Sequence, residues 1–428
     1  MRIALIADAF PPLRSSGAVQ LRDLSREFAR QGHAVTVLIA SPELGQPWHL
    51  EQWDGIQVLR LRTPKTKDVN YVRRTVAEFF MPYAMLRNLR RSPLAHASFD
   101  GVVWYSPTIF LGPVARAIKA RSACPSYLII RDIFPEWAVD MGLMGRGLPY
   151  HFFKSVANRQ YRLADVIGVQ TPGNLAYFQG RAAAHANLEV LHNWLADTPD
   201  RGCSVSVQRS TLSGRKIFVY AGNMGIAQGM GILLDLAERL LHRADVGFLF
   251  VGRGSDARRL RDDAARRGLD NVIFCDEIDP DEIPGLYAQC HVGLVALDPR
   301  HKTHNIPGKF LSYMQASLPV LANINAGNDL VGLIQEMRVG RVCTDNCADV
   351  LAAQAAELLA DLERDREVAA RCKALAKQMF SPAAAVSQIS QALEYERQGN
   401  FKRNFGRVGA RSEPVGADEA TPQYSSEL

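Results

Sequence analysis

The sequence predicts an α/β fold built from two doubly wound domains, each with a parallel sheet. Short apolar runs alternate with longer segments of helical periodicity along most of the 428 residues, which is the pattern of successive strand–helix–strand units. A polar stretch over 196–214, poor in aliphatic residues, interrupts this alternation and predicts a linker. With 47% hydrophobic residues the chain can bury two cores, which excludes a fibrous or a largely disordered protein.

Residues 1–195 carry the periodicity of one complete domain. We expect strands over 2–7, 34–40, 56–61, 101–105, 126–130, 166–169 and 188–191. Helices are expected between them, over 18–30, 70–90, 108–121 and 149–164. This alternation predicts a Rossmann-like sheet with helices on both faces.

Residues 215–380 predict a second domain of the same architecture, with strands near 216–221, 246–251, 271–275, 291–297 and 319–323. A further helix is expected over about 381–397, and the polar, glycine-rich residues 399–428 predict a disordered tail. Open parallel sheets bind ligands at the carboxyl ends of their strands. We therefore expect a binding site in a cleft between the two domains.

The strongest functional signal is the run Asn305-Ile306-Pro307-Gly308-Lys309, which begins a helix after the strand over 291–297. Pro307 suits the first turn of a helix, Gly308 lets a ligand approach the backbone, and Lys309 adds a cation. Because the start of a helix already favours an anion, this run predicts a diphosphate site. A helix that only packs its apolar face and leaves Lys309 exposed is the alternative.

Two loops of the second domain are expected at the same edge of its sheet. The loop from Gly222 and Asn223 to Gln228 joins a strand to a helix and is placed to meet a diphosphate, although a plain turn is the alternative. Arg253 follows the next strand and can approach the same group. Gly252-Arg253-Gly254 lacks a third glycine and a ribose-binding acid, so it does not indicate a dinucleotide site.

The first domain offers acidic residues at the end of a buried strand. Arg131 and Asp132 follow the strand over 126–130, where an unpaired charge is costly. Asp132, with Glu136 close behind it, is a candidate to accept a proton from a hydroxyl group. An ion pair of Arg131 with one of these acids is the alternative. Gly17 either frees backbone for a ligand or only shapes a turn.

The formal net charge of +6 is unevenly distributed. Between 65 and 91 many cations accompany apolar side chains: Lys65, Lys67, Arg73, Arg74, Arg87, Arg90 and Arg91 with Val76, Phe79, Phe80, Met81, Tyr83, Met85 and Leu86. This composition predicts a basic amphipathic helix that lies on anionic lipid, or else a helix packed on its own domain. These cations are not interleaved with an aromatic platform, so they do not indicate nucleic-acid binding. No apolar run in the sequence approaches the roughly 18 residues that span a bilayer.

These motifs together resemble the retaining glycosyltransferase family with the GT-B fold, of the glycosyltransferase family 4 type. The resemblance rests on the opening strand that leads to Gly17, on the segments 30–37 and 220–229, and on the helix over 305–314. The sequences of residues 131–136 and 305–314 are similar to those of the branch typified by the L-fucosamine transferase WbuB. The resemblance implies two Rossmann-like domains facing a cleft, the first on the acceptor side and the second on the donor side, with the last helix crossing back onto the first.

The same resemblance implies a function. A retaining enzyme of this branch moves N-acetyl-L-fucosamine from a UDP-sugar to a lipid-linked (undecaprenyl-diphosphate) oligosaccharide, without a metal or other cofactor. Such transfer serves O-antigen, capsule or exopolysaccharide synthesis at the cytoplasmic face of the inner membrane. No nucleic acid takes part.

Several positions depart from the family pattern. The family carries diphosphate cations where this chain has Asn223 and Gln228, and paired glutamates where it has His304 and Ser312. Lys309 must then carry more of the diphosphate charge. Glu277 lies in a segment that resembles the one whose backbone contacts the nucleotide base in the family. A solvated turn is the alternative.

Two other functions stay open at this point. A nucleotide-sugar 2-epimerase also uses two facing α/β domains, but it needs carboxylates and histidines around the sugar. A non-catalytic partner of a polysaccharide assembly is suggested by the loss of both glutamates and both cations.

Overall fold

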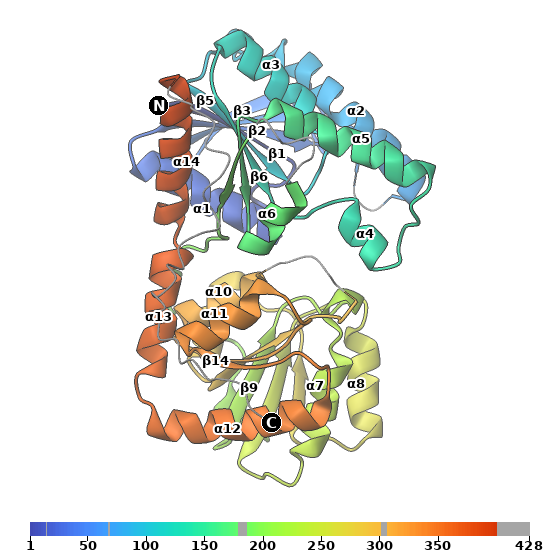
Figure 1. The fold of residues 1–428 in the computed structure, drawn as a ribbon, viewed down its shortest axis with the longest axis vertical. Coiled ribbons are helices and arrows are strands. Elements are labelled where there is room, and N and C mark those ends of the chain that lie inside the picture. Colours follow the sequence, from blue (N-terminus) through green and yellow to red (C-terminus); the bar gives the residue numbers. More distant parts are fainter. Residues whose placement is uncertain (14, 67–68, 179–185, 301–305, 400–428) are drawn as a thin grey trace, which may run out of the picture.

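A computed structural model describes residues 1–13, 15–66, 69–178, 186–300 and 306–399. Figure 1 shows two α/β domains stacked along the long axis, each built around one sheet with helices on both faces. The fold class expected from the sequence is therefore confirmed. No helix in these ranges is long and apolar enough to cross a bilayer.

The first domain contains a mixed succession of strands and helices. In chain order these are β1 (Arg2–Ala7), α1 (Ser16–Arg30), β2 (Ala34–Ser41), β3 (Trp48–Trp53), β4 (Ile56–Arg62), α2 (Tyr71–Leu89), β5 (Gly101–Ser106), α3 (Gly112–Ser122), β6 (Ser126–Ile130), α4 (Glu136–Asp140), α5 (Leu148–Leu163), β7 (Val166–Val169), α6 (Pro172–Phe178) and β8 (Asn187–Val190). The sheet has the order β3-β4-β2-β1-β5-β6-β7-β8, and only β3 runs antiparallel to its neighbour.

The second domain follows a short 3₁₀ turn over Val207–Arg209. Its elements are β9 (Lys216–Ala221), α7 (Gly231–Arg239), β10 (Val246–Val251), α8 (Ala257–Arg266), β11 (Val272–Cys275), α9 (Ile283–Tyr287), β12 (Val292–Ala296), α10 (Gly308–Gln315), β13 (Val320–Asn323), α11 (Asp329–Met337), β14 (Gly340–Cys343), α12 (Ala348–Arg364) and α13 (Val368–Met379). The last helix, α14 (Pro382–Arg397), follows this domain in sequence. The parallel sheet has the order β11-β10-β9-β12-β13-β14.

Apolar side chains on alternate residues build a core on each face of both sheets. In β9, Ile217 and Val219 join the core on one face, while Phe218 and Tyr220 join the core on the other. Both faces must be apolar because helices cover both, which explains why these strands read as continuous hydrophobic runs.

The last helix, α14, packs against the first domain although it follows the second in sequence. Its side chains Ala385, Val386, Ile389 and Leu393 are buried in the same core as Ile3 and Leu5 of β1. Figure 1 shows α13 and α14 running along one side of both domains. The chain thus connects the two domains twice.

Some elements differ from the sequence expectation. The edge strands β3 and β14 and the short helices α4 and α6 were not expected, and α3 begins at Gly112 instead of 108. Pro113 explains this start, because proline favours the first turn of a helix.

Gly252 allows the loops after β9 and β10 to lie in direct backbone contact. Its φ is +141°, and a Cβ added to it would lie 2.1 Å from the carbonyl oxygen of Gly222.

We predict that Gly252→Ala lowers the free energy of unfolding by about 2–4 kcal/mol, because it combines backbone strain with a clash. Gly231→Ala is the matched control, since an added Cβ there meets no atom within 4 Å. Equal urea unfolding curves for both variants would contradict this account.

Candidate active site

The strand orders locate one binding region in each domain. In an open parallel sheet, ligands bind where neighbouring strands lead their connections in opposite directions. In the first sheet this point lies between β1 and β5, and in the second it lies between β9 and β12. The segments that follow these four strands carry several of the residues expected from the sequence, including Gly17, Asn223 and Lys309.

Helix α10 begins beside the switch point of the second sheet. Pro307 is its N-cap residue, and no side chain of the described residues caps it. The first N–H groups of a helix have no partner within the helix, and they carry the positive end of its dipole. The start of α10 therefore offers free hydrogen-bond donors and a favourable potential to an anion.

The ammonium group of Lys309 adds a full charge at this helix start. Its Nζ lies 4.7 Å from the centre of the Tyr220 ring, and it forms no ion pair with a described residue. Loss of hydration lowers the pKa of Lys309 to about 8. A cation that has lost water without gaining a carboxylate is suited to bind an incoming anion.

The loop after β9 approaches the same lysine but contributes no charge. A Cβ added to Gly222 would lie 3.9 Å from Cε of Lys309. The side chain of Asn223 donates to Oε1 of Gln228 at 3.2 Å, and the N–H of Gly225 donates to the same oxygen at 3.0 Å. Two neutral amides therefore hold this loop together.

Arg253 is the second cation expected near a diphosphate, and it already has a partner. Its Nε lies 2.9 Å from a carboxylate oxygen of Glu277, and both side chains are exposed. An exposed pair of this kind is weak, so a bound ligand can break it at little cost. The glycines on either side of Arg253 allow close backbone contact with the loop after β9.

Other residues of the expected donor segment have varied surroundings. Ile306 is 3% exposed and belongs to the core of the second domain, so only its backbone faces the site. The hydroxyl of Ser312 donates to the carbonyl of Gly308 at 3.3 Å. His304 and Asn305 lie outside the described residues.

The start of α10 lies near the start of α1 in the first domain. A Cβ added to Gly308 would lie 3.8 Å from Oγ of Ser16. A Cβ added to Gly17 would lie 3.4 Å from the ring of Tyr105, which extends from the end of β5. Gly17 therefore lies beside Tyr105 at this junction.

Asp132 is exposed close to this junction. Burial raises the pKa of the Tyr105 phenol, the Arg131 guanidinium lowers it, and the charges of Asp132 and Asp8 raise it further. Asp8, Tyr105 and Asp132 lie at or just after the ends of β1, β5 and β6, at one edge of the sheet. Asp132 forms no hydrogen bond or ion pair with a described residue, so its carboxylate is available to a ligand.

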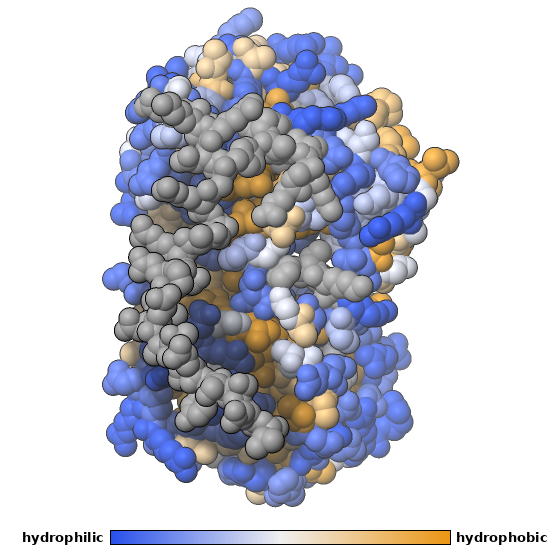
Figure 2. Space-filling view, viewed as in Figure 1, coloured by the Kyte–Doolittle hydropathy of each residue, from blue (hydrophilic) through white to orange (hydrophobic). Residues whose placement is uncertain are grey.

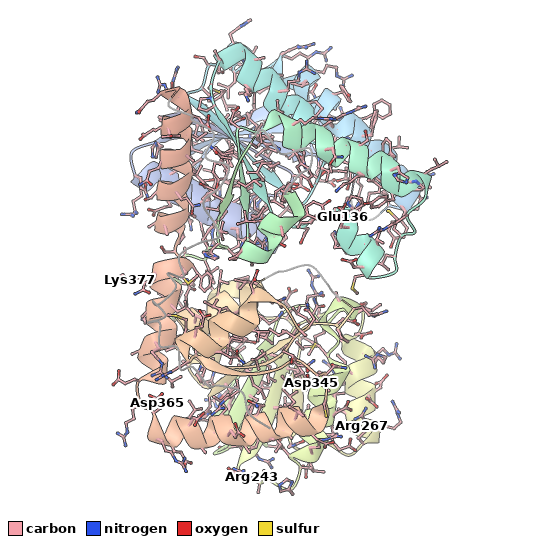
Figure 3. All side chains as sticks on the ribbon, viewed as in Figure 1. Glu136, Arg243, Arg267, Asp345, Asp365 and Lys377 are labelled. Atoms are coloured by element: carbon pink, nitrogen blue, oxygen red, sulfur yellow. The ribbon has the colours of Figure 1, made fainter. Side chains whose placement is uncertain are left out.

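Glu136 is held by neighbours on α5. Its Oε1 accepts hydrogen bonds from Nζ of Lys154 and from the hydroxyl of Tyr150, the second at 3.1 Å. Its Oε2 is buried without a donor from the described residues. Figure 3 shows Glu136 at the start of α4, on the side of the first domain that faces the second. The alternative considered from the sequence, an ion pair of Arg131 with one of these acids, does not form, because Arg131 donates to Asn193.

Asn193 and Gln170 were missed by the sequence reasoning. Both are 2% exposed, and they hydrogen-bond each other at the ends of β7 and β8. The available signal was their position: Gln170 directly follows the buried strand β7, and Asn193 lies three residues after β8. Neither residue is charged, and neither belongs to a motif that indicates a function.

The chemistry of the site follows from these groups. One unpaired cation and a free helix start can bind a diphosphate leaving group, and an exposed carboxylate lies across the domain junction. Within the described ranges, no three His, Cys, Asp or Glu side chains are placed to hold a metal ion.

Comparisons with known proteins agree with this arrangement. Residues 215–361 match the family model described as glycosyl transferases group 1, and residues 17–194 match that of the glycosyl transferase 4-like domain. The chain is 27% identical over 297 residues to WcaI of Escherichia coli K12, a protein named for colanic acid biosynthesis glycosyl transfer, and the match covers 62% of this chain and 69% of WcaI.

Solved structures show the same fold. Sucrose-phosphate synthase of Thermosynechococcus elongatus superposes with a TM-score of 0.70 at 16% identity, over 94% of this chain and 100% of that one. The HepE protein of Anabaena, solved in complex with UDP-glucose, superposes with a TM-score of 0.64 at 17% identity, over 92% of this chain and 100% of that one.

The pairing of Glu136 with Lys154 can be tested by stability. We predict that Lys154→Met lowers the free energy of unfolding by about 3–5 kcal/mol, because it leaves a largely buried carboxylate without its cation. The double variant Glu136→Gln with Lys154→Met should recover most of this loss, as measured by urea unfolding. A single variant that costs less than about 1 kcal/mol would show that the pair contributes little to the fold.

Proposed function

The chain is a glycosyltransferase of the GT-B fold, and we propose that it transfers a sugar from a UDP-sugar to a lipid-linked oligosaccharide with retention of the anomeric configuration. The observation that carries this proposal is the position of the Lys309 ammonium, over the Tyr220 ring at the uncapped start of α10. Among the functions considered, transfer from a nucleotide donor makes the most direct use of such an anion site. The epimerase and the non-catalytic partner are not favoured, because both family models describe glycosyl transferases.

The diphosphate of the donor is the group that Lys309 and the start of α10 bind. As the bond between the anomeric carbon and the phosphate oxygen breaks, negative charge grows on the leaving diphosphate. Fixed donors and a nearby cation stabilise that charge more strongly than they stabilise the bound donor. Arg253 breaks its ion pair with Glu277 and contacts the diphosphate. Its guanidinium then supplies the second positive charge, which the neutral side chains of Asn223 and Gln228 do not provide.

The acceptor hydroxyl attacks from the side of the first domain. Its oxygen forms the new bond to the anomeric carbon on the face that the diphosphate leaves, so no protein nucleophile is needed. Asp132 accepts the hydroxyl proton, a role supported by its exposed carboxylate without a partner among the described residues. Glu136 positions α4 beside it through Lys154.

The sugar and the pathway rest on similarity to other proteins. WcaI is named for colanic acid biosynthesis, and HepE was solved with UDP-glucose. These names support a UDP donor and a role in the synthesis of a surface polysaccharide such as O-antigen, capsule or exopolysaccharide. Within that class we propose N-acetyl-L-fucosamine as the donor sugar, on the resemblance of residues 131–136 and 305–314 to the fucosamine transferase branch.

We further propose that the enzyme works at the cytoplasmic face of the inner membrane. Large apolar side chains are exposed along α2, the loop before α5 and α5 itself: Tyr71, Val72, Val76, Phe80, Tyr83, Leu143, Leu148 and Phe152. The rings of Phe79 and Phe152, 6.2 Å apart, join the two helices into one surface. Figure 2 shows apolar side chains gathered at the edge of the first domain where Figure 1 places α2 and α5.

The charges beside this apolar surface suit anionic lipid. Glu78, the acidic residue of α2, is already paired with Arg74. Residues 141–163 contain no Asp or Glu, but they contain Arg146, Arg159 and Arg162, besides the Lys154 that pairs with Glu136. Apolar side chains that enter a bilayer and cations that contact its headgroups are the two parts of a reversible membrane anchor. Lys67, expected to contribute, lies outside the described residues.

Donor binding provides the first test. We predict that UDP and one UDP-sugar bind the wild-type protein in isothermal titration, and that Lys309→Met weakens both by about tenfold or more. The affinity of the wild type for UDP should fall as the pH rises from 7 to 9, because the ammonium loses its proton as the pH passes about 8. Lys309→Met should show no such fall. A wild type and a variant with the same affinity and the same pH dependence would exclude Lys309 from the diphosphate site.

Membrane binding provides the second test. We predict that the protein sediments with vesicles containing anionic phospholipid, and that the triple variant Leu143→Ser, Leu148→Ser, Phe152→Ser does not. The control variant Leu241→Ser, Val350→Ser removes exposed apolar side chains from the second domain and should sediment like the wild type. Equal sedimentation of all three proteins would contradict the assignment of this surface.

A further inference from the structure

Asn193 connects the acceptor side of the site to the donor side. It follows β8 in the first domain and is 2% exposed. Its Nδ2 donates to the carbonyl oxygen of Ile306, in the second domain, at 3.1 Å, and to Oε1 of Gln170 at 3.0 Å. Its Oδ1 accepts a hydrogen bond from Nη1 of Arg131. One buried amide thus bonds to both domains.

Each partner of Asn193 adjoins a residue of the proposed site. Arg131 directly precedes Asp132, and its carbonyl accepts a hydrogen bond from Nε2 of Gln170 at 2.7 Å. Ile306 lies two residues before Gly308, where α10 begins. The amide therefore links the backbone next to the proposed proton acceptor with the backbone next to the diphosphate site.

The surroundings make this link stiff. Ile306 is anchored in the core of the second domain, and Gln170 is buried in the first. Buried hydrogen bonds leave no room for water to replace a lost partner, so the network strongly favours one arrangement. A small displacement of α10 relative to Asp132 would break at least one of these bonds.

Other bonds also join the domains, but they do not reach the reacting groups. Gln315, the last residue of α10, donates to the carbonyl of Leu195 at 2.6 Å. The N–H of Gly173 donates to a carboxylate oxygen of Asp329 at 2.8 Å. These bonds hold the domains together, so they preserve the overall assembly when the bonds of Asn193 are lost.

We propose that Asn193 is a positioning residue for sugar transfer, which fixes the donor helix α10 relative to the segment that carries Asp132. This inference rests on the proposed function. Asn193 contacts neither Lys309 nor a reacting group, so it acts on alignment instead of on donor affinity. Misplacement of reacting groups by about 1 Å can lower a rate by about 100-fold.

The substitution Asn193→Asp tests this role with almost no change in shape. The aspartate keeps an oxygen that can accept from Arg131. It removes the N–H groups that donate hydrogen bonds to the carbonyl of Ile306 and to Oε1 of Gln170. We expect kcat for transfer to fall by about 100-fold while the Kd for UDP changes by less than threefold. The ratio of UDP-sugar hydrolysis to transfer should rise, because a misplaced acceptor lets water compete for the donor.

Gln315→Leu is the matched control, because it removes another bond between α10 and the first domain at the far end of the helix. It should lower kcat by less than threefold. Asn193→Ser, which leaves a smaller polar group, replaces Asn193→Asp if that variant does not fold, and it should show the same fall in kcat at an unchanged Kd.

The outcomes separate this inference from the proposed function. Wild-type protein that binds no UDP and transfers no sugar would overturn the proposed function and the inference with it. An active wild type with equally active Asn193 variants would overturn only the inference. Asn193 variants that lose UDP affinity in proportion to kcat, or that match Gln315→Leu, would show a merely structural role.

Discussion

The site depends on one charge that the fold leaves uncompensated. Lys309 lies at the start of α10, over the Tyr220 ring, without an ion pair to any described residue. A cation at a helix start, without a carboxylate partner among the described residues, favours a bound anion, and we propose that this anion is a diphosphate. The neighbouring loop is closed by the neutral pair of Asn223 and Gln228, which concentrates this task on Lys309. Hydrogen bonds of Asn193 to Ile306 and of Gln315 to Leu195 join the first domain to the segment that carries Lys309.

Much of the fold followed from the sequence, because strands buried on both faces leave a strong apolar signal. The strands β1, β6 and β9 lie where the apolar runs were expected. The edge strand β3 was missed because its sequence, Trp48–Trp53, mixes polar and apolar residues and pairs on one side only. The start of α3 was misplaced because its capping signal lies in Gly112 and Pro113, not in the periodicity.

The site was less predictable than the fold, since it depends on pairs that form across long sequence distances. Sequence reasoning could place Lys309 at a helix start, because that requires only local motifs. It could not show that Glu136 takes Lys154 as its partner, or that Arg131 bonds to Asn193. Both were decided by the packing of strands and helices far apart in the chain. The buried amide of Asn193 carries no charge or motif, so only its position between the domains reveals it.

The most direct measurement of the central claim is a crystal structure of the protein with UDP bound. The account predicts diphosphate oxygens within about 3 Å of Nζ of Lys309 and of the first backbone N–H groups of α10. Diphosphate bound elsewhere, with Lys309 still over the Tyr220 ring and no anion beside it, would contradict the account.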